Sequence, residues 1–162
     1  MSINPDRSEK RRNSTIAREA YFLDYAANIK KTISIPIIVT GGFRTRSAME
    51  SAIGNNACEM IGVGRPLCAD PLSIKKLLSG EIEQLSRYEK SLSFGPWIFS
   101  PSSPFRLIQA INGFGAQAWF YQQIKRISRN EDPDLNMSVF AALRKDLAED
   151  VAAVKALKGE YK

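Results

Sequence analysis

The sequence of 162 residues contains no histidine and only two cysteines. Without an imidazole, the chain cannot by itself form a Ser-His-Asp or Cys-His catalytic group or an HExxH zinc motif. Cys58 and Cys68 fit neither a CxxC redox pair nor the ligand spacing of a zinc site. We interpret both as small buried hydrophobic residues, and we expect no metal site.

Long hydrophobic runs are also missing. The longest apolar runs, such as residues 35–39, are far shorter than the roughly 20 residues that span a bilayer. Residues 1–13 lack the apolar core of a secretory signal. We therefore expect a cytoplasmic protein with no membrane partner. The chain is also shorter than the roughly 250 residues of a complete (β/α)₈ barrel, so a barrel interpretation requires a partial barrel.

Positive charge is in excess, with a formal net charge of +6. A basic balance suits nucleic acid or another polyanion, and Lys10, Arg11 and Arg12 form a short basic run. The sequence shows neither a base-stacking module nor a recognition helix. We favour a solvated, flexible N-terminal segment over residues 1–14 and no nucleic-acid partner.

The first half of the chain has the pattern of an α/β fold. An amphipathic helix is predicted over residues 15–31, followed by a β-branched apolar run at 35–40. A short helix at 47–53 and a second apolar run at 60–63 follow. Two such runs joined by a helix indicate a right-handed βαβ unit whose parallel strands are covered on both faces.

Glycines follow both predicted strands. Gly41 and Gly42 end the first, and Gly64 with Arg65 follow the second. Glycine lets backbone N–H groups approach an anion closely, and a guanidinium matches phosphate oxygens, although a tight turn would also use glycine. Loops after neighbouring parallel strands lie side by side, which favours a phosphate site. A dinucleotide fingerprint is excluded because Leu67 stands where its third glycine belongs.

The loop over residues 91–104 is rich in serine, proline and aromatic residues. Its aromatic cluster, Phe94, Trp97 and Phe99, has two interpretations. It anchors the tail in the core, which we favour, or it covers a substrate opening or docks a partner.

Two helices are predicted after this loop. Ser103 and Pro104 open a segment that runs towards Ile127 and that glycines at 113 and 115 interrupt. A boundary follows at residues 130–136. The last segment carries an apolar stripe on one face, so we expect a packed C-terminal helix. The stripe contains Phe140, Leu143, Leu147, Val151 and Val154.

Taken in order, several segments resemble the NADH:flavin oxidoreductases of the Old Yellow Enzyme superfamily. They are residues 18–22 (REAYF), 35–44 (IPIIVTGGFR), 61–66 (IGVGRP) and Asp70-Pro71. Other FMN-binding barrels share similar phosphate loops, but the upstream REAYF segment and the Gly-Arg-Pro tip favour this family.

The resemblance implies the last two βα units of an FMN-binding (β/α)₈ TIM barrel, strands seven and eight, followed by C-terminal helices. It implies that Gly41, Gly42, Gly64 and Arg65 hold the FMN phosphate and that Phe43 lines the edge of the flavin. The corresponding division is a flexible segment (1–14), barrel units (15–90), an aromatic loop with a helical tail (91–130) and a C-terminal amphipathic helix (131–162).

The resemblance also implies an ene-reductase reaction, in which NAD(P)H reduces FMN and the flavin reduces an α,β-unsaturated carbonyl substrate. The family's catalytic residues lie on earlier strands, so we assign no catalytic residue and expect this chain to be an inactive C-terminal fragment. Exposed strand edges predict self-association or a barrel-completing chain. The alternative is a non-catalytic half-barrel protein that binds a phosphorylated ligand or a partner.

Overall fold

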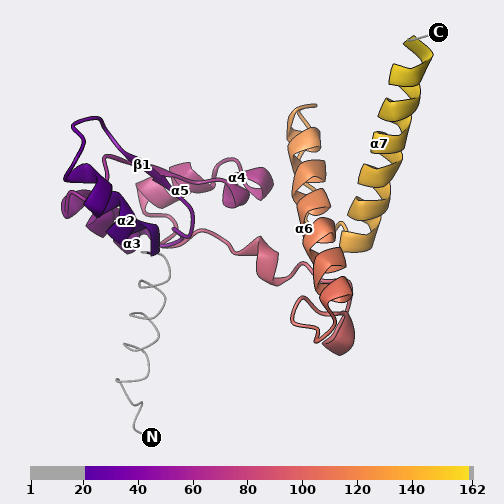
Figure 1. Ribbon diagram of the computed structural model, residues 1–162, viewed down its shortest axis with the longest axis horizontal. Coiled ribbons are helices and arrows are strands. Elements are labelled where there is room, and N and C mark those ends of the chain that lie inside the picture. The colour runs from indigo at the N-terminus through magenta and orange to yellow at the C-terminus, as the bar shows by residue number, and fades with distance from the viewer. Residues whose placement is uncertain (1–20, 161–162) are drawn as a thin grey trace, which may run out of the picture. The chain divides into compact units, whose positions relative to one another are not determined.

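A computed structural model describes residues 21–160 of the chain (Figure 1). The described residues form two compact units. Unit 1 comprises residues 21–67 and 72–86, and unit 2 comprises residues 68–71 and 87–160. Among the helices of residues 21–160, none is both long and apolar enough to cross a membrane.

Unit 1 contains the predicted βαβ unit. Helix α2 (Tyr21–Lys30) precedes strand β1 (Ile38–Thr40), helix α3 (Arg46–Gly54) and strand β2 (Met60–Gly62). The strands form a two-stranded parallel sheet in which Val39 lies opposite Ile61. Element order and strand direction are as predicted. The described residues therefore form a partial α/β fold, and a barrel does not follow from two strands.

The sheet is covered on one face only, so the prediction of strands buried on both faces is wrong. Val39 is 5% exposed and packs among small side chains of α2 and α3, whereas Ile38 and Met60 are more than half exposed. Strand residues alternate between the two faces of a sheet. Within the described residues, one face of β1–β2 packs on α2 and α3 and the other stays open.

Two short helices follow β2, namely α4 (Arg65–Ala69) and α5 (Ser73–Ser79). Gly80 ends α5 in the left-handed conformation that favours glycine, with φ of +79°. The chain then returns to the start of α3, where Thr45 forms an isolated bridge with Gln84 and Leu85 is fully buried.

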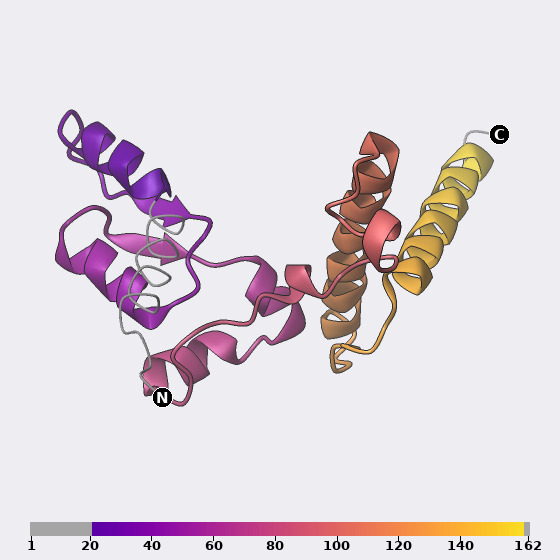
Figure 2. The same cartoon turned by 90° about the horizontal axis from the view of Figure 1, so that it is seen from below.

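Unit 2 is helical. It contains the 3₁₀ turns η1 (Tyr88–Lys90) and η2 (Trp97–Phe99) and the long helices α6 (Arg106–Ile127) and α7 (Val139–Glu160). The two long helices lie side by side along the start of α7 and diverge towards their C-terminal ends (Figures 1 and 2). Residues 130–136, where the sequence predicts a boundary, lie in the connection between these two helices.

Helix α6 differs from its prediction at two points. It begins at Arg106 instead of at Ser103-Pro104, because Ser103 is buried and its hydroxyl accepts a hydrogen bond from the N–H of Phe105. It also runs without interruption through Gly113 and Gly115. A Cβ at Gly115 would lie 2.4 Å from Val139 and 2.6 Å from Phe94, so this glycine permits close packing.

Two predictions of core packing in unit 2 are wrong. Trp97 is 89% exposed and Phe99 is about half exposed, while Phe94 alone of the aromatic cluster packs partly against the core. The stripe on α7 is largely exposed, since Phe140 and Leu147 are both more than half accessible. Its first two turns bury Val139 and Ala142 instead.

Candidate functional site

The strand register of unit 1 brings the predicted site loops together. Thr40, the last residue of β1, lies opposite Gly62, the last residue of β2. Because the strands are parallel, the chain leaves both at the same edge of the sheet. The segments that begin at Gly41 and Val63 therefore start side by side. This edge is where ligands bind in α/β folds with parallel strands.

The Gly-Gly pair after β1 has a backbone conformation that favours glycine. Gly41 has φ of +117° and Gly42 has φ of +79°. A side chain at either position would be strained. A Cβ at Gly41 would also contact the ring of Phe22 at 3.4 Å. The backbone conformation of the turn alone therefore explains the two glycines. At this turn the chain bends sharply over the end of the sheet.

Gly64 and Gly62 lack a side chain for different reasons. A Cβ at Gly62 would lie 2.0 Å from the hydroxyl oxygen of Thr40, so Gly62 serves strand packing. A Cβ at Gly64 would meet nothing within 4 Å, and its φ lies outside the left-handed region. Neither backbone strain nor packing requires glycine at position 64. The open space beside it is accessible to a ligand.

Arg65 follows at once as the first residue of α4, and its side chain is exposed. The structure thus brings the four predicted residues to one edge of unit 1. The Gly41-Gly42 turn follows β1, and Gly64, with open space beside it, follows β2 at the same edge. The guanidinium of Arg65 comes directly after Gly64. Such an arrangement suits a phosphate, because backbone N–H groups and an arginine fork both donate to its oxygens.

Phe43 does not line this edge. It is 1% exposed and packs in the core of unit 1 with Val39 and Ala48, so its prediction as a flavin contact is wrong for this structure. The neighbouring Arg44 is also buried, at 6% exposure, and one of its terminal nitrogens donates to the carbonyl of Phe43 at 2.7 Å. Sequence reasoning missed the burial of Arg44, because the GGFR segment alone does not show which side chains turn inward.

The charged pair beside the sheet lies at the other end of the strands. Glu59 precedes β2, accepts a hydrogen bond from the N–H of Ile37 at 2.8 Å, and pairs with Lys30 of α2. The Ile37 N–H, followed by Lys30, lowers the pKa of the Glu59 carboxyl below its usual range. This carboxylate joins helix and strands, so its charge has a structural role remote from the glycine loops.

Neither cysteine nor a metal cluster adds chemistry to this edge. Cys58 is fully buried in the core of unit 1 and Cys68 is half-buried, and burial raises the pKa of both thiols. A raised thiol pKa reduces the nucleophilic thiolate at neutral pH. No group of three or more potential metal ligands occurs within residues 21–160. We therefore assign no catalytic residue to the described part of the chain.

Two curated proteins that are similar to this chain are named as NADH-dependent flavin oxidoreductases. The chain is 43% identical over 61 residues to the NADH-dependent flavin oxidoreductase iliE of Hypocrea jecorina, a match that covers 37% of the chain. It is 29% identical over 116 residues, 69% of the chain, to the NADH-dependent flavin oxidoreductase iccE of Talaromyces variabilis. The chain is homologous, over part of its length, to NADH-dependent flavin oxidoreductases. This homology is consistent with a family of the Old Yellow Enzyme type.

This homology covers a small part of each relative. The matches span 15% of the Hypocrea protein and 27% of the Talaromyces protein. A third relative, a bilirubin reductase of Mediterraneibacter gnavus, is 42% identical over 57 residues, which is 35% of this chain and 9% of that protein. No family model and no solved structure matches the chain.

Proposed function

We propose that this chain is the phosphate-holding C-terminal part of an FMN-dependent NAD(P)H oxidoreductase of the ene-reductase type. The observation that carries the proposal is the common edge of β1 and β2, where Gly41-Gly42 and Gly64-Arg65 start side by side. The names of the homologues support a flavin and NADH. We infer FMN as the flavin because this edge can hold a phosphate and because the family that the sequence resembles uses FMN.

The residues at this edge fit a phosphomonoester. Backbone N–H groups of Gly41, Gly42 and Gly64 would donate to its oxygens, and Arg65 would neutralise its charge. Bound FMN would supply hydride-transfer chemistry between NAD(P)H and an activated alkene such as an α,β-unsaturated carbonyl. The chain's own contribution is to hold and orient the cofactor's phosphate. We place the residues that contact the substrate on barrel units outside this chain.

Gly64→Ala tests the phosphate contact without disturbing the fold. The added methyl group meets no protein atom within 4 Å, so the thermal midpoint should stay unchanged, whereas a phosphate seated against the backbone would be displaced. We expect FMN affinity to fall about tenfold or more, in line with roughly 1.5–3 kcal/mol for charge-assisted hydrogen bonds. Gly54→Ala is the matched control, because its methyl group also points into open space.

Arg65→Ala should weaken FMN binding by a similar factor. Arg129→Ala, which removes an exposed arginine from unit 2, is the matched control and should leave FMN binding unchanged. Riboflavin has the same ring system but no phosphate, so it should bind at least tenfold more weakly than FMN. The readout is quenching of flavin fluorescence. Equal affinity of the wild-type chain for FMN and riboflavin, or of Gly64→Ala and Gly54→Ala for FMN, would refute the phosphate site.

The alternative is a non-catalytic protein that binds some other phosphorylated ligand at the same edge. The burial of Phe43 favours this alternative, because Phe43 is the one residue for which the sequence predicts a contact with the flavin ring. Competition distinguishes the two functions. If inorganic phosphate and FMN bind equally well, the edge recognises phosphate alone and the alternative holds. If FMN binds much more tightly, the flavin ring also contributes.

A further inference from the structure

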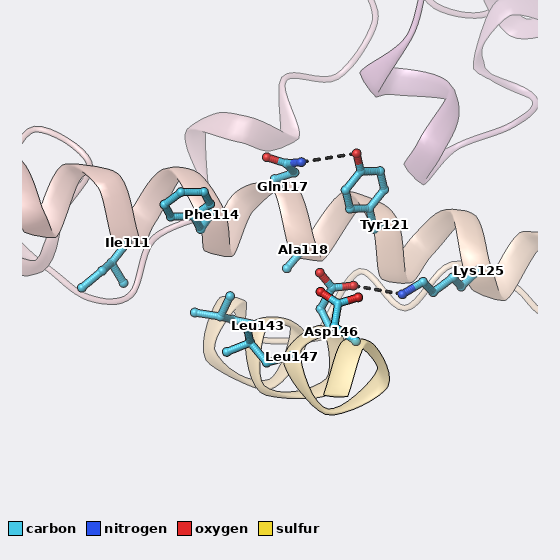
Figure 3. Close-up of a pocket in the computed structure, with 10 residues that line it drawn as sticks. Ile111, Phe114, Gln117, Ala118, Tyr121, Lys125, Leu143, Asp146 and Leu147 are labelled. Atoms are coloured by element: carbon cyan, nitrogen blue, oxygen red, sulfur yellow. Dashed lines mark hydrogen bonds and ion pairs between the residues drawn. The ribbon is translucent and has the colours of Figure 1, made fainter. Parts of the chain in front are cut away.

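A groove of about 750 Å³ lies between α6 and α7 of unit 2 (Figure 3). Its lining is largely apolar, with Phe114 and Tyr121 on α6 and Leu147 on α7. Phe114, Tyr121 and Leu147 are each about half exposed or more. Exposure of such a lining to water is unfavourable. An apolar surface that fills the groove lowers the free energy.

The charged side chains at one end of the groove are paired with one another, but two carboxylates share one ammonium group. Lys125 donates to Asp146 at 2.9 Å and to Glu149 at 2.6 Å, and Gln122 donates to Glu149 at 3.1 Å. Asp150 also lines the groove and is exposed. The groove therefore offers an occupant mainly apolar surface, with an excess of negative charge at one end.

The second half of α7 provides an apolar surface of matching kind. Contacts with α6 are made by Val139, Asp146 and Glu149, each about 24 residues beyond its α6 partner. Beyond these contacts α7 diverges from α6 (Figures 1 and 2). We call residues 150–160 the distal half of α7. Its apolar side chains Val151 and Val154 are each about half exposed.

The apolar stripe of α7 is nearly symmetric about position 149. With Leu157 added to the five residues that the sequence predicts, the stripe has six members: Phe140, Leu143, Leu147, Val151, Val154 and Leu157. Reversing the helix about position 149 brings Leu147 onto Val151, Leu143 within one residue of Val154, and Phe140 within one residue of Leu157. The apolar positions of the stripe therefore nearly coincide with those of the same helix read in reverse. Two copies of α7 that pack antiparallel place apolar residues opposite apolar residues, as a two-fold interface requires.

We propose that two copies of this chain associate through α7, with the distal half of each helix docked in the α6–α7 groove of the other. The two α7 helices run antiparallel about a two-fold axis near Glu149. In this arrangement Val151 and Val154 of one copy pack on Leu147 and Leu143 of the second copy. Each copy gives one apolar surface and receives an identical one, so the association closes at a dimer.

The available apolar area is sufficient for a stable dimer. Seven side chains of the stripe and groove are between 47% and 65% exposed: Phe114, Tyr121, Phe140, Leu147, Val151, Val154 and Leu157. At roughly 180 Å² for a side chain of this size, they expose on the order of 600–700 Å². A standard protein interface buries about 800 Å² on each partner. Backbone and polar atoms at the rim supply the difference.

The charge distribution predicts how the dimer responds to salt. Glu149 lies at the axis and Asp150 one residue from it, so carboxylates of the two copies approach each other. Salt screens this repulsion and strengthens apolar burial. The dimer should therefore be at least as tight at high ionic strength as at low. Asp150→Asn reduces the repulsion and should tighten the dimer severalfold.

Sedimentation equilibrium of the full chain with Val151→Glu tests the interface. The glutamate sits in the centre of the stripe on a side chain already half exposed, so the protomer should keep its helical circular dichroism while the dimer weakens about a hundredfold. Ala152→Glu adds the same charge at the next residue, off the stripe, and should leave the dimer intact. A monomeric wild-type chain, or equal weakening by both variants, overturns the proposal.

Cross-linking tests the antiparallel orientation. A Leu143→Cys chain is mixed with a differently tagged Val154→Cys chain and treated with a short bismaleimide. The antiparallel dimer predicts cross-links between the two chains and few between identical chains, whereas a parallel pairing would give the reverse and would overturn the proposal. Wild-type chains, which retain Cys58 and Cys68, give the background. No flavin is needed, so the result is independent of the proposed function.

Discussion

The two units of the chain position their loops by different physical means. In unit 1 the register of two parallel strands places the glycine loops side by side, and the core beneath them consists mainly of small side chains such as Ala26, Ala48 and Ala52. In unit 2 buried polar side chains fix the loops. Asn112, which is 2% exposed, accepts from the N–H of Phe94 and donates to the carbonyl of Phe99.

Buried side chains of α6 also hold the connection to α7 through hydrogen bonds to its backbone. Gln123 is fully buried and accepts a hydrogen bond from the N–H of Asp134 at 2.7 Å, in the connection to α7. Trp119 donates its ring N–H to the carbonyl of Met137 at 2.9 Å. Truncating one such side chain leaves a buried backbone group without its partner. Unit 2 should therefore depend on single large side chains, and unit 1 on close backbone packing.

The largest expected effect is that of Trp119→Ala in unit 2. Trp119 is 1% exposed, stacks on Tyr88 with ring centroids 6.1 Å apart, and meets Phe120 edge to face at 5.2 Å. Removing it leaves a cavity and the Met137 carbonyl without its donor, so the free energy of unfolding of unit 2 should fall by about 3–5 kcal/mol. Chemical denaturation followed by circular dichroism measures this loss.

Trp97→Ala is the matched control for this prediction, because Trp97 is 89% exposed. It should change the free energy of unfolding by less than about 0.5 kcal/mol. Hydrogen exchange resolves the two units separately. If amides of α2 and α3 in the Trp119→Ala variant lose protection as fully as those of α6, the two units unfold together and the contrast between them does not hold for stability.

A smaller effect is expected for Gly62→Ala in unit 1. The new Cβ would lie 2.0 Å from the hydroxyl oxygen and 3.0 Å from the Cβ of Thr40, so the strands must shift apart. We expect a loss of about 1–3 kcal/mol, as for other overpacked positions, measured by thermal denaturation of unit 1. Gly64→Ala, which adds a methyl group into open space two residues later, should cost almost nothing.

A double-mutant cycle identifies the clash as the cause. Thr40→Ala removes the hydroxyl and methyl groups nearest to the new Cβ, so adding it should recover part of the stability lost in Gly62→Ala. Strictly additive losses in the double variant would mean that Gly62 is required for another reason, such as strand flexibility.

The difference between the units also explains which features the sequence predicts. The βαβ unit follows from two β-branched runs that each end in glycine, because strand propensity and turn geometry act within a few neighbouring residues. The strand length does not follow, since the apolar run starts at Ile35 but β1 starts at Ile38, opposite the first residue of β2. Pairing with Met60, and not apolar character, sets this boundary. The distinction between Gly62 and Gly64 likewise depends on Thr40 across the sheet.

Unit 2 was harder to predict because its features depend on contacts between distant residues. Gly115 is tolerated within α6 because Val139 and Phe94 pack where its side chain would be. The periodicity of α7 identifies one apolar face correctly, yet it contains no information on what covers that face. The domain boundaries drawn from the sequence stay a prediction, and residues 1–20 and 161–162 of the predicted segments lie outside the described residues.

The smallest expected effect is the contribution of Lys125 and Glu149 to the pH dependence of unit 2. Hydrogen bonds from Lys125 and Gln122 lower the pKa of the Glu149 carboxyl below its ordinary value of 4.5, and those to Glu149 and Asp146 raise the pKa of Lys125 above 10.5. A carboxyl with a lowered pKa stabilises the folded state above its ordinary pKa, and this stability is lost as pH falls through the folded value. A raised lysine pKa gives stability below 10.5 that is lost at higher pH.

The pair should therefore contribute fully between about pH 4.5 and 10.5. Both side chains are about one-third exposed, so solvent screening limits the contribution to at most about 1 kcal/mol. Glu149→Gln should lower the denaturation midpoint at pH 7. The variant should also lose less stability than wild type when the pH falls below 4.5, because it has no carboxylate at position 149 to protonate. Asp132→Asn, which neutralises an exposed carboxylate in the connection before α7, is the control and should retain the acid transition. An acid transition that is identical in wild type and Glu149→Gln would show that the contacts of Val139 and Ala142 hold α7 on α6 without help from this ion pair.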